Sequence, residues 1–301
     1  MMECKKALQD SEVNGDIGKA MDWLRAKGIA KATSENSRVA AEGLIAVFQN
    51  SGKVTLVEVN SETDFVSRNS SFQKFVSLVA STANSLDYGE IPLDEVMALS
   101  TPQQGSNGKA LTLQDILGDI TTSIRENIIV RRVTNINAAG SDTIAASYIH
   151  GKVTLSDEGH QGLEMGREAA VVCLKGSALE GGAEVLTQAA RRLAMHVVAA
   201  KPTYLRAEDV PEDVLFSERA IYIEQTIASP PKNPAMFEKI VEGKVNKRLA
   251  EMSLLGQNHM AAEGTPVVAK YLKSLESETG CNDLAISGYW RWSLGQLATP
   301  K

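Results

Sequence analysis

The sequence predicts an α+β protein: a helical N-terminal segment followed by two related units, each an antiparallel sheet with helices on one face. Three observations lead to this fold class. A pattern of paired strands, a helix and a closing strand occurs twice, about 100 residues apart. A proline-interrupted pair of helical segments lies inside the second copy. The apolar residues near the N-terminus recur at helical spacing.

Residues 1–40 predict a helical module and a linker. The chain turns at residues 14–16, and apolar residues follow at helical spacing from Ile17 until Gly28 ends the pattern. Residues 1–28 therefore predict two short helices, which are too small to bury a core by themselves. The following stretch up to residue 41 is rich in Ala, Lys and Ser and suits an exposed helix or a linker.

Residues 41–139 predict the first unit. Its strands are expected at 44–48 and 54–59, because both are rich in β-branched and apolar residues and flank a turn at 50–52. The other expected elements are a loop at 60–71, a helix at 72–83, a largely loop segment at 86–110, a helix at 111–124 and a strand at 128–133.

Residues 140–301 predict the second unit, in which the same order returns. We expect a strand at 145–150, a polar insertion at 157–167, a strand at 169–174, a glycine-bearing loop at 176–182, a helix at 185–198 and a closing strand at 288–292.

Residues 211–252, inserted into the second unit, predict a helical hairpin. Two helical segments are broken by Ser229-Pro230-Pro231. The apolar residues of the first arm should face those of the second, namely Val214, Ile221 and Ile227 against Phe237, Ile240, Val241, Val245 and Leu249. The pattern fits equally well a hairpin that protrudes from the sheet and a pair of helices packed in the core.

Composition excludes several classes of protein. The 31 Lys and Arg residues against 37 Asp and Glu residues give a net charge of -6, so the chain lacks a general electrostatic attraction to nucleic acid. No apolar run approaches the roughly 18 residues that cross a bilayer. Three cysteines, odd in number and far apart, indicate a reducing compartment. We therefore expect neither direct nucleic-acid binding nor membrane insertion.

The signatures of common enzyme sites are missing, and we expect no cofactor and no bound metal. The sequence contains no P-loop, no strand-coupled glycine fingerprint and no nucleophile elbow. Its four histidines lack the spacing of a zinc hydrolase. Gly181-Gly182 before a predicted helix could hold an anion, but a plain loop is the better interpretation.

The segment from Glu58 to Asn69 stands out because a strand ends in polar residues and then places Phe65 in a loop. In one interpretation Thr63 or Asp64 caps a local turn and Phe65 packs into the sheet edge. In the other, Phe65 is an anchor for a partner and Asp64 flanks it. Burying the ring in a partner would contribute roughly 2 to 3 kcal/mol, enough for an interface hot spot.

At this segment the sequence resembles the elongation factor Ts family, the guanine nucleotide exchange factors of elongation factor Tu. Residues 59–68, VNSETDFVSR, resemble the central signature of that family, and residues 2–8, MECKKAL, resemble the end of its N-terminal signature. Further similar segments are 127–133, 147–151, 194–197, 201–202, 208–210, 241–243 and 253–257. The resemblance implies that the N-terminal module is a truncated, ubiquitin-associated-like domain and that the hairpin is the coiled-coil element of the family.

The resemblance also implies a function and a set of contacts. The protein should bind elongation factor Tu and promote release of GDP without covalent chemistry; the alternative is a scaffold or chaperone subunit that binds a GTPase without exchange. The contact residues implied for elongation factor Tu are Met2, Lys5, Thr63, Asp64, Phe65, Val66, Ile124, His150, His259 and Met260. Asp64 and Phe65 would disturb the Mg²⁺ and phosphate site, and the hairpin is a candidate for self-association.

Two further expectations depend on the same resemblance. Arg125 stands where related sequences often have glycine, and the insertion at 157–167 is additional. The insertion and the amino-acid sequence of residues 62–69 favour a mitochondrial matrix protein, with the chloroplast stroma and the bacterial cytoplasm as alternatives.

Overall fold

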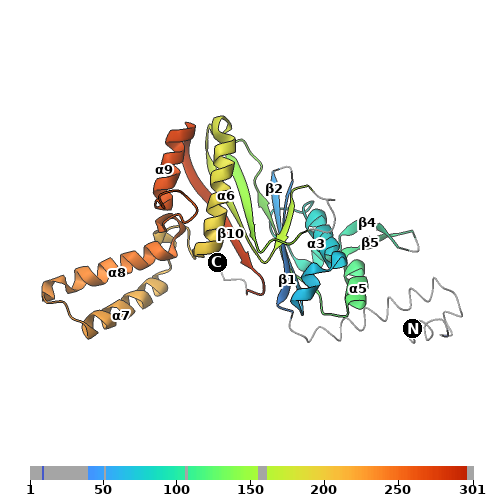
Figure 1. Ribbon diagram of the computed structural model, residues 1–301, viewed down its shortest axis with the longest axis horizontal. Coiled ribbons are helices and arrows are strands. Elements are labelled where there is room, and N and C mark those ends of the chain that lie inside the picture. Colours follow the sequence, from blue (N-terminus) through green and yellow to red (C-terminus); the bar gives the residue numbers. More distant parts are fainter. Residues whose placement is uncertain (1–8, 10–39, 51, 106–107, 155–160, 297–301) are drawn as a thin grey trace. The chain divides into compact units, whose positions relative to one another are not determined.

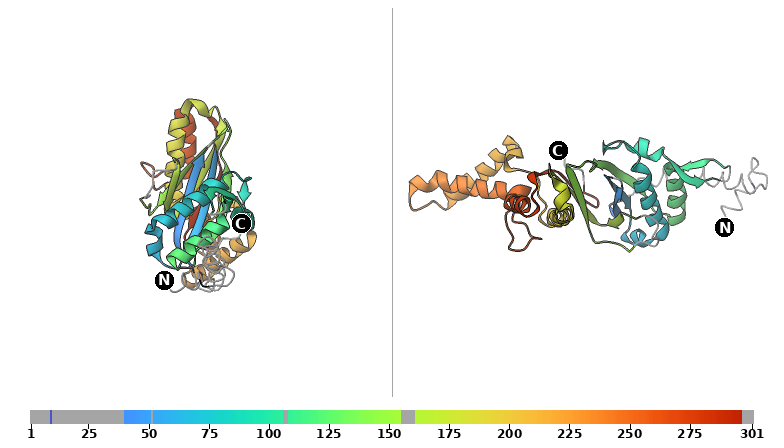
Figure 2. Two further views of the ribbon diagram at one scale, coloured as in Figure 1. Left: turned by 90° about the vertical axis from the view of Figure 1, so that its right-hand side faces the viewer. Right: turned by 90° about the horizontal axis from the view of Figure 1, so that it is seen from above.

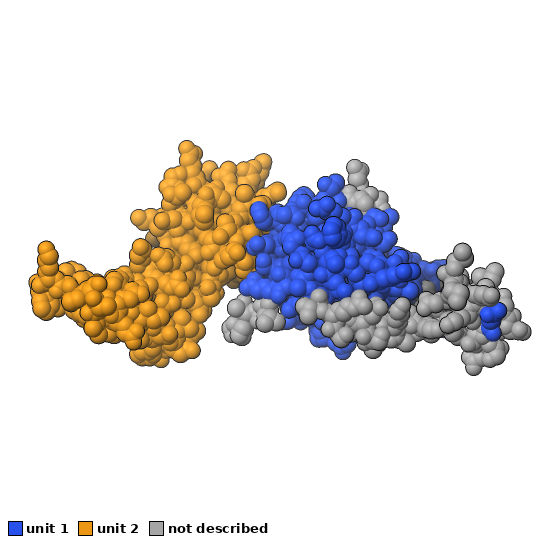
Figure 3. All heavy atoms as spheres, turned by 60° about the horizontal axis from the view of Figure 1, so that its bottom comes forward, with its two compact units in different colours: residues 1–139, 149–169, 292–301 blue, residues 140–148, 170–291 orange. Residues whose placement is uncertain are grey.

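The computed structural model describes residues 9, 40–50, 52–105, 108–154 and 161–296. The predicted N-terminal module therefore lies almost wholly outside the described residues. The chain divides into two compact units, coloured separately in Figure 3. Unit 1 contains residues 1–139, 149–169 and 292–301, and unit 2 contains residues 140–148 and 170–291. Neither unit is one continuous stretch of chain, because the segments 149–169 and 292–301 return to unit 1.

Unit 1 is built on a five-stranded sheet of order β3-β6-β2-β1-β8. The strands β1 and β2 form an antiparallel hairpin, as the sequence predicts, and β6 pairs antiparallel with β2. The strands are β1 (Glu42–Asn50), β2 (Lys53–Ser61), β3 (Gly89–Glu90), β6 (Ile129–Asn137) and β8 (Leu163–Gly166).

Two helices, α3 (Ser70–Ala83) and α5 (Leu113–Ile124), cover one face of this sheet (Figures 1 and 2). Phe72 and Phe75 of α3 are fully or almost fully buried and belong to one apolar core with Leu44 and Val57 of the strands. Helix α3 begins where it does because the side chain of Asn69 accepts hydrogen bonds from the first free backbone N–H groups. The core thus fixes the chain on both sides of residues 62–69.

Unit 2 repeats this plan with a three-stranded sheet of order β10-β9-β7. The first, second and closing strands are neighbours in that order, as are β1, β2 and β6 of unit 1, which confirms the predicted duplication within an α+β fold. The elements are β7 (Thr143–His150), β9 (Glu168–Ser177), β10 (Asn282–Ser293), α6 (Ala183–Ala200) and α9 (Val268–Thr279). A second apolar core lies between this sheet and its helices.

The predicted helical hairpin is present as α7 (Glu212–Ala228) and α8 (Phe237–Met252). Both helices extend away from the other elements of unit 2 (Figure 1), so the protruding arrangement is confirmed. The predicted contact between the arms is wrong in part, since Ile221 and Ile227 are 46% and 63% exposed. Val241 and Val245 of α8 are buried as predicted, and the buried residue of α7 is Thr226.

Other sequence expectations need correction. The segment 86–110 is not mainly loop: it contains β3, helix α4 (Leu93–Met97) and the two-stranded ribbon of β4 (Ser100–Gln104) and β5 (Ala110–Thr112). The described part of the insertion 157–167 contains β8, which pairs with β1. The loop 60–71 includes a 3₁₀ helix, and α9 was not predicted. Apart from α9, whose buried Val268, Leu272 and Leu275 recur at helical spacing, these elements are short, so their apolar periodicity is weak.

A buried carboxylate joins the last described residues of unit 1 to its sheet. The Glu58 side chain on β2 is fully buried and accepts a 2.7 Å hydrogen bond from Nε of Arg132 on β6. Its other oxygen accepts the backbone N–H of Gly295 at 2.9 Å. The guanidinium of Arg132 also lies 4.2 Å above the Trp292 ring. Because both oxygens of the Glu58 carboxylate have partners, its buried charge is compensated. This happens near the end of β2, which leads into residues 62–69.

Candidate functional site

The ring of Phe65 lies on the surface of unit 1, on the short 3₁₀ helix η1 (Asp64–Arg68). It is 76% exposed, more than any other large apolar side chain in the described part of the chain. The interpretation that places Phe65 in the sheet edge is therefore wrong. Thr63 stands at the N-cap position but makes no capping bond with its side chain, and Asp64 is exposed beside the ring.

Phe65 points outward because the next residue points inward. Val66 is only 5% exposed and packs in the core of unit 1. The hydroxyl of Ser67 donates to the carbonyl of Asp64 at 2.6 Å, and the N–H of Asn69 donates to the carbonyl of Val66 at 2.9 Å. Local hydrogen bonds thus hold the backbone of η1, and Val66 packs it against the core. The aromatic ring of Phe65 lies on the solvent side.

A second chain segment holds the start of this turn. The strands β2 and β6 run antiparallel, so the residues after β2 lie beside those before β6. Both Thr63 N–H and Thr63 Oγ1 donate to the carboxylate of Glu126, at 3.0 and 2.6 Å. In return, the carboxylate of Glu62 accepts the N–H of Asn127 at 2.7 Å. The two carboxylates clasp the segments together just outside the sheet.

Ile124 is the last residue of α5 and packs partly buried against the same core. The next residue, Arg125, adopts a left-handed conformation with φ 65°, and its N–H donates to the carbonyl of Thr121 at 2.8 Å. Glycine takes this conformation without steric cost, so Arg125 adopts a backbone conformation that favours glycine. The structure therefore brings Thr63, Asp64, Phe65 and Val66 next to the turn that follows Ile124.

The remaining predicted contact residues lie elsewhere. His150 is exposed at the end of β7 and belongs to unit 1, where its carbonyl accepts the N–H of Arg167 at 2.9 Å. His259 and Met260 belong to unit 2. Met2 and Lys5 lie outside the described residues.

His259 and Met260 differ sharply in exposure. Met260 is 63% exposed, whereas His259 is fully buried and cannot reach a partner without unfolding its loop. The ring of His259 lies edge-on against Tyr271 with centroids 4.7 Å apart, and 5.2 Å from the ring of His196. His196 Nδ1 accepts the N–H of Met260 at 3.2 Å, while its Nε2 lies 3.0 Å from Gln257 Oε1. The buried histidines thus hold the loop that exposes Met260.

Both rings favour the neutral form. Burial lowers the pKa of His259 to about 4, and the nearby charges of His196 and Arg192 act in the same direction. Burial also lowers the pKa of His196, partly opposed by its hydrogen bond to Gln257. At neutral pH the pair is therefore uncharged.

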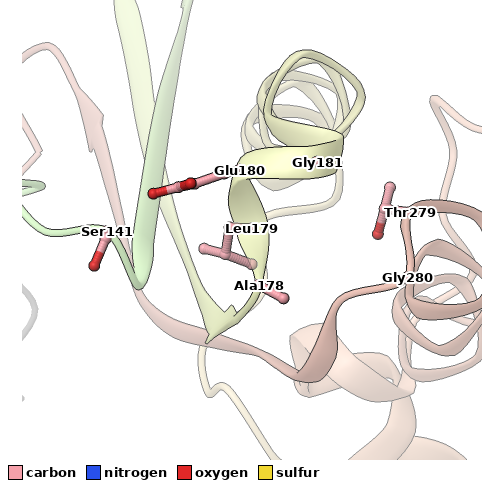
Figure 4. A pocket seen from close by; sticks show the side chains of 7 residues that line it. All are labelled: Ser141, Ala178, Leu179, Glu180, Gly181, Thr279 and Gly280. Atoms are coloured by element: carbon pink, nitrogen blue, oxygen red, sulfur yellow. The ribbon is translucent and has the colours of Figure 1, made fainter.

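The glycine loop before α6 lines a surface pocket, shown in Figure 4. Of the seven described residues that line it, one is charged, and that residue is the acidic Glu180. An anion would be repelled there, so the plain-loop interpretation of Gly181 and Gly182 is favoured.

Two features typical of metalloenzymes and of membrane proteins are absent from the described ranges. No group of three or more His, Cys, Asp or Glu side chains is arranged there to hold a metal ion. No helix within these ranges is long and apolar enough to cross a membrane.

Comparison with known proteins identifies the family to which the chain belongs. The family profile described as Elongation factor TS matches residues 62–296. The chain belongs to the elongation factor Ts family. It is 37% identical to elongation factor Ts of Sinorhizobium medicae and 39% identical to that of Rhizobium johnstonii, over 98% of this chain and 88% of each relative. Elongation factor Ts of Methylorubrum extorquens is 37% identical over the same shares.

Membership of the elongation factor Ts family supports a role as a translation elongation factor. The family profile spans the clasp around Phe65, the hairpin, the whole sheet of unit 2, and strands β3, β6 and β8 of the unit 1 sheet. Two positions that hold candidate contact segments were missed by the sequence reasoning, Glu126 in unit 1 and His196 in unit 2. The antiparallel pairing of β2 and β6 was the available signal for Glu126, since it predicts that residues near 127 lie beside residue 62. No comparable signal existed for His196.

Proposed function

We propose that this protein binds elongation factor Tu in its GDP form and promotes release of GDP, which allows GTP to bind. The observation that carries the proposal is the exposed Phe65 ring on a turn that is braced on two sides. A large apolar ring held in water is unfavourable unless a partner buries it. Family membership supports elongation factor Tu as that partner.

In the proposed mechanism, Phe65 enters the GTP-binding domain of elongation factor Tu between helices near the nucleotide, and Asp64 contacts the same surface. Mg²⁺ in such sites bridges the nucleotide phosphates and protein oxygens. A wedge that displaces those oxygens weakens the binding of GDP. By linkage, GDP weakens the binding of the exchange factor by the same factor, so rebinding of nucleotide releases it. This protein performs no covalent step.

The other predicted contacts have further roles in this proposal. Thr63 and Val66 set the turn, and Ile124 supports the same surface of unit 1. Met2 and Lys5 are proposed to touch the GTP-binding domain from the N-terminal module. His150 and Met260 are proposed to contact another domain of elongation factor Tu. His259 is buried, so its proposed role is to hold the loop of Met260.

Stopped-flow release of fluorescent GDP from purified elongation factor Tu tests the function. Adding this protein should accelerate release in a concentration-dependent and saturable manner. A scaffold or chaperone subunit would bind elongation factor Tu but leave the release rate unchanged. Binding without acceleration would therefore refute the exchange function and support the alternative.

A calorimetric titration separates this proposal from an enzyme that itself uses nucleotide. We expect no heat of GDP binding to this protein alone. Tight binding of GDP would contradict the proposed role, because the nucleotide should be held by elongation factor Tu.

The mitochondrial matrix is the proposed location, with the chloroplast stroma and the bacterial cytoplasm as the alternatives. The relatives compared above come from bacteria. Fractionation of the source cells, with detection of this protein by antibody, distinguishes the three.

A further inference from the structure

One carboxylate holds the turn of Phe65 from outside the turn itself. We propose that Glu126 is a positioning residue, which fixes Thr63 and thereby orients the Phe65 ring before a partner arrives. This inference rests on the proposed exchange function and adds to it a residue that need not touch elongation factor Tu.

The contact between Glu126 and Thr63 has two points. One carboxylate oxygen accepts the backbone N–H of Thr63 at 3.0 Å, and the other accepts its hydroxyl at 2.6 Å. Hydrogen bonds to a charged acceptor are stronger than those between neutral groups. Because its hydroxyl is engaged by Glu126, Thr63 makes no capping bond to η1. The orientation of the residue at the start of η1 is therefore set by Glu126, together with the Ser61 hydroxyl, which donates to the carbonyl of Thr63 at 2.9 Å.

The fold also fixes Glu126 in place. Helix α5 ends at Ile124, and the left-handed Arg125 turns the chain toward β6. The N–H of the next residue, Asn127, donates to Glu62 at 2.7 Å. Both hydrogen-bonded segments directly adjoin the paired ends of β2 and β6, where Asn60 faces Ile129. Glu126 thus projects from a rigid part of unit 1.

Such a fixed point matters because η1 is a five-residue 3₁₀ helix. Helices of this kind have poor hydrogen-bond geometry and are rarely stable by themselves. Val66 and the bonds of Ser67 and Asn69 hold its middle and its end, whereas Glu126 holds its start. A loop that is ordered in advance loses less entropy on binding, so it binds more tightly.

Two substitutions separate the hydrogen bonds from the charge. Glu126→Ala removes both bonds to Thr63, and we expect kcat/KM for GDP release to fall roughly 10-fold, as for the loss of a charged hydrogen bond. Glu126→Gln can still accept the N–H of Thr63 and can donate its amide to the hydroxyl oxygen. We expect this variant to stay within about 3-fold of wild type. Glu95→Ala, at an exposed carboxylate on α4, is the matched control and should exchange like wild type.

A double-mutant cycle tests whether Glu126 acts through Phe65. If it does, Glu126→Ala should have little further effect once Phe65→Ala is present. Amide hydrogen exchange of residues 64–68 provides a readout without elongation factor Tu. These amides should exchange faster in Glu126→Ala, while the urea unfolding midpoint stays close to that of wild type.

Three results would overturn the inference. Wild-type exchange by Glu126→Ala would show that the clasp does not position the ring. Equal losses in Glu126→Gln and Glu126→Ala would show that the charge itself contacts the partner. Additive effects with Phe65→Ala would show an independent role. If the wild-type protein fails to accelerate GDP release from elongation factor Tu, the proposed function is wrong. Amide hydrogen exchange then still decides whether Glu126 orders the turn.

Discussion

Substitution of Phe65 by alanine should abolish most of the exchange activity and leave the fold almost unchanged. The ring is 76% exposed, so about 150 Å² of its surface is free to be buried by a partner. At roughly 25 cal/mol per Å², that burial contributes about 4 kcal/mol, or several hundred-fold in affinity. The buried remainder is small, so the free energy of unfolding should fall by less than about 1 kcal/mol.

The assay compares GDP release, binding to elongation factor Tu and urea unfolding for three proteins. Tyr88→Ala removes another exposed aromatic ring from unit 1 and should release GDP like wild type. Val66→Ala should show a different pattern, losing about 2 kcal/mol of stability because its side chain is buried in the core. Wild-type rates from Phe65→Ala would refute the reasoning, as would a large loss of stability, since the ring would then serve the fold.

Three further predictions concern other parts of the molecule. Arg132→Met leaves the carboxylate of Glu58 buried without its cation and should cost about 3 to 5 kcal/mol in urea unfolding, whereas a loss below about 1 kcal/mol would contradict the pairing. His259 has a pKa of about 4 in the folded state and near 6.5 in the unfolded state. Its contribution to the free energy of unfolding is therefore complete above pH 6.5 and is lost as the pH falls toward 4. Between pH 7.5 and 5, wild type should therefore lose about 2 kcal/mol more than His259→Gln. If the hairpin mediates self-association, Phe216→Ser, at a 69% exposed position on α7, should lower the sedimentation coefficient at high protein concentration. If the wild type and the variant both sediment as monomers, self-association through the hairpin is excluded.

The fold class and the order of the main strands could be predicted from the sequence because the two sheets repeat a long apolar pattern. Runs such as 44–48 and 54–59 are almost continuously buried, and a buried strand gives a strong signal. Strand β8 could not be predicted, because its four residues pair with β1 across more than a hundred residues of sequence. On α8 the predicted seam residues Val241 and Val245 are buried, but on α7 the sequence did not select the buried side, because its apolar residues are spread around the helix. Periodicity then fails to select one stripe.

For the site, sequence reasoning identified the residue that points outward but not the residues that make it do so. Phe65 attracted attention through residue type and loop position alone, and the sequence left open whether it was exposed. The buried Val66 places the ring on the solvent side, and Glu126 holds the start of the turn through Thr63, 63 positions away. The same holds for Met260, whose loop depends on His196, 64 positions earlier. In both places a polar contact from a residue distant in sequence holds the segment that carries the exposed side chain. Substituting that distant residue should therefore impair binding without altering any residue proposed to touch elongation factor Tu.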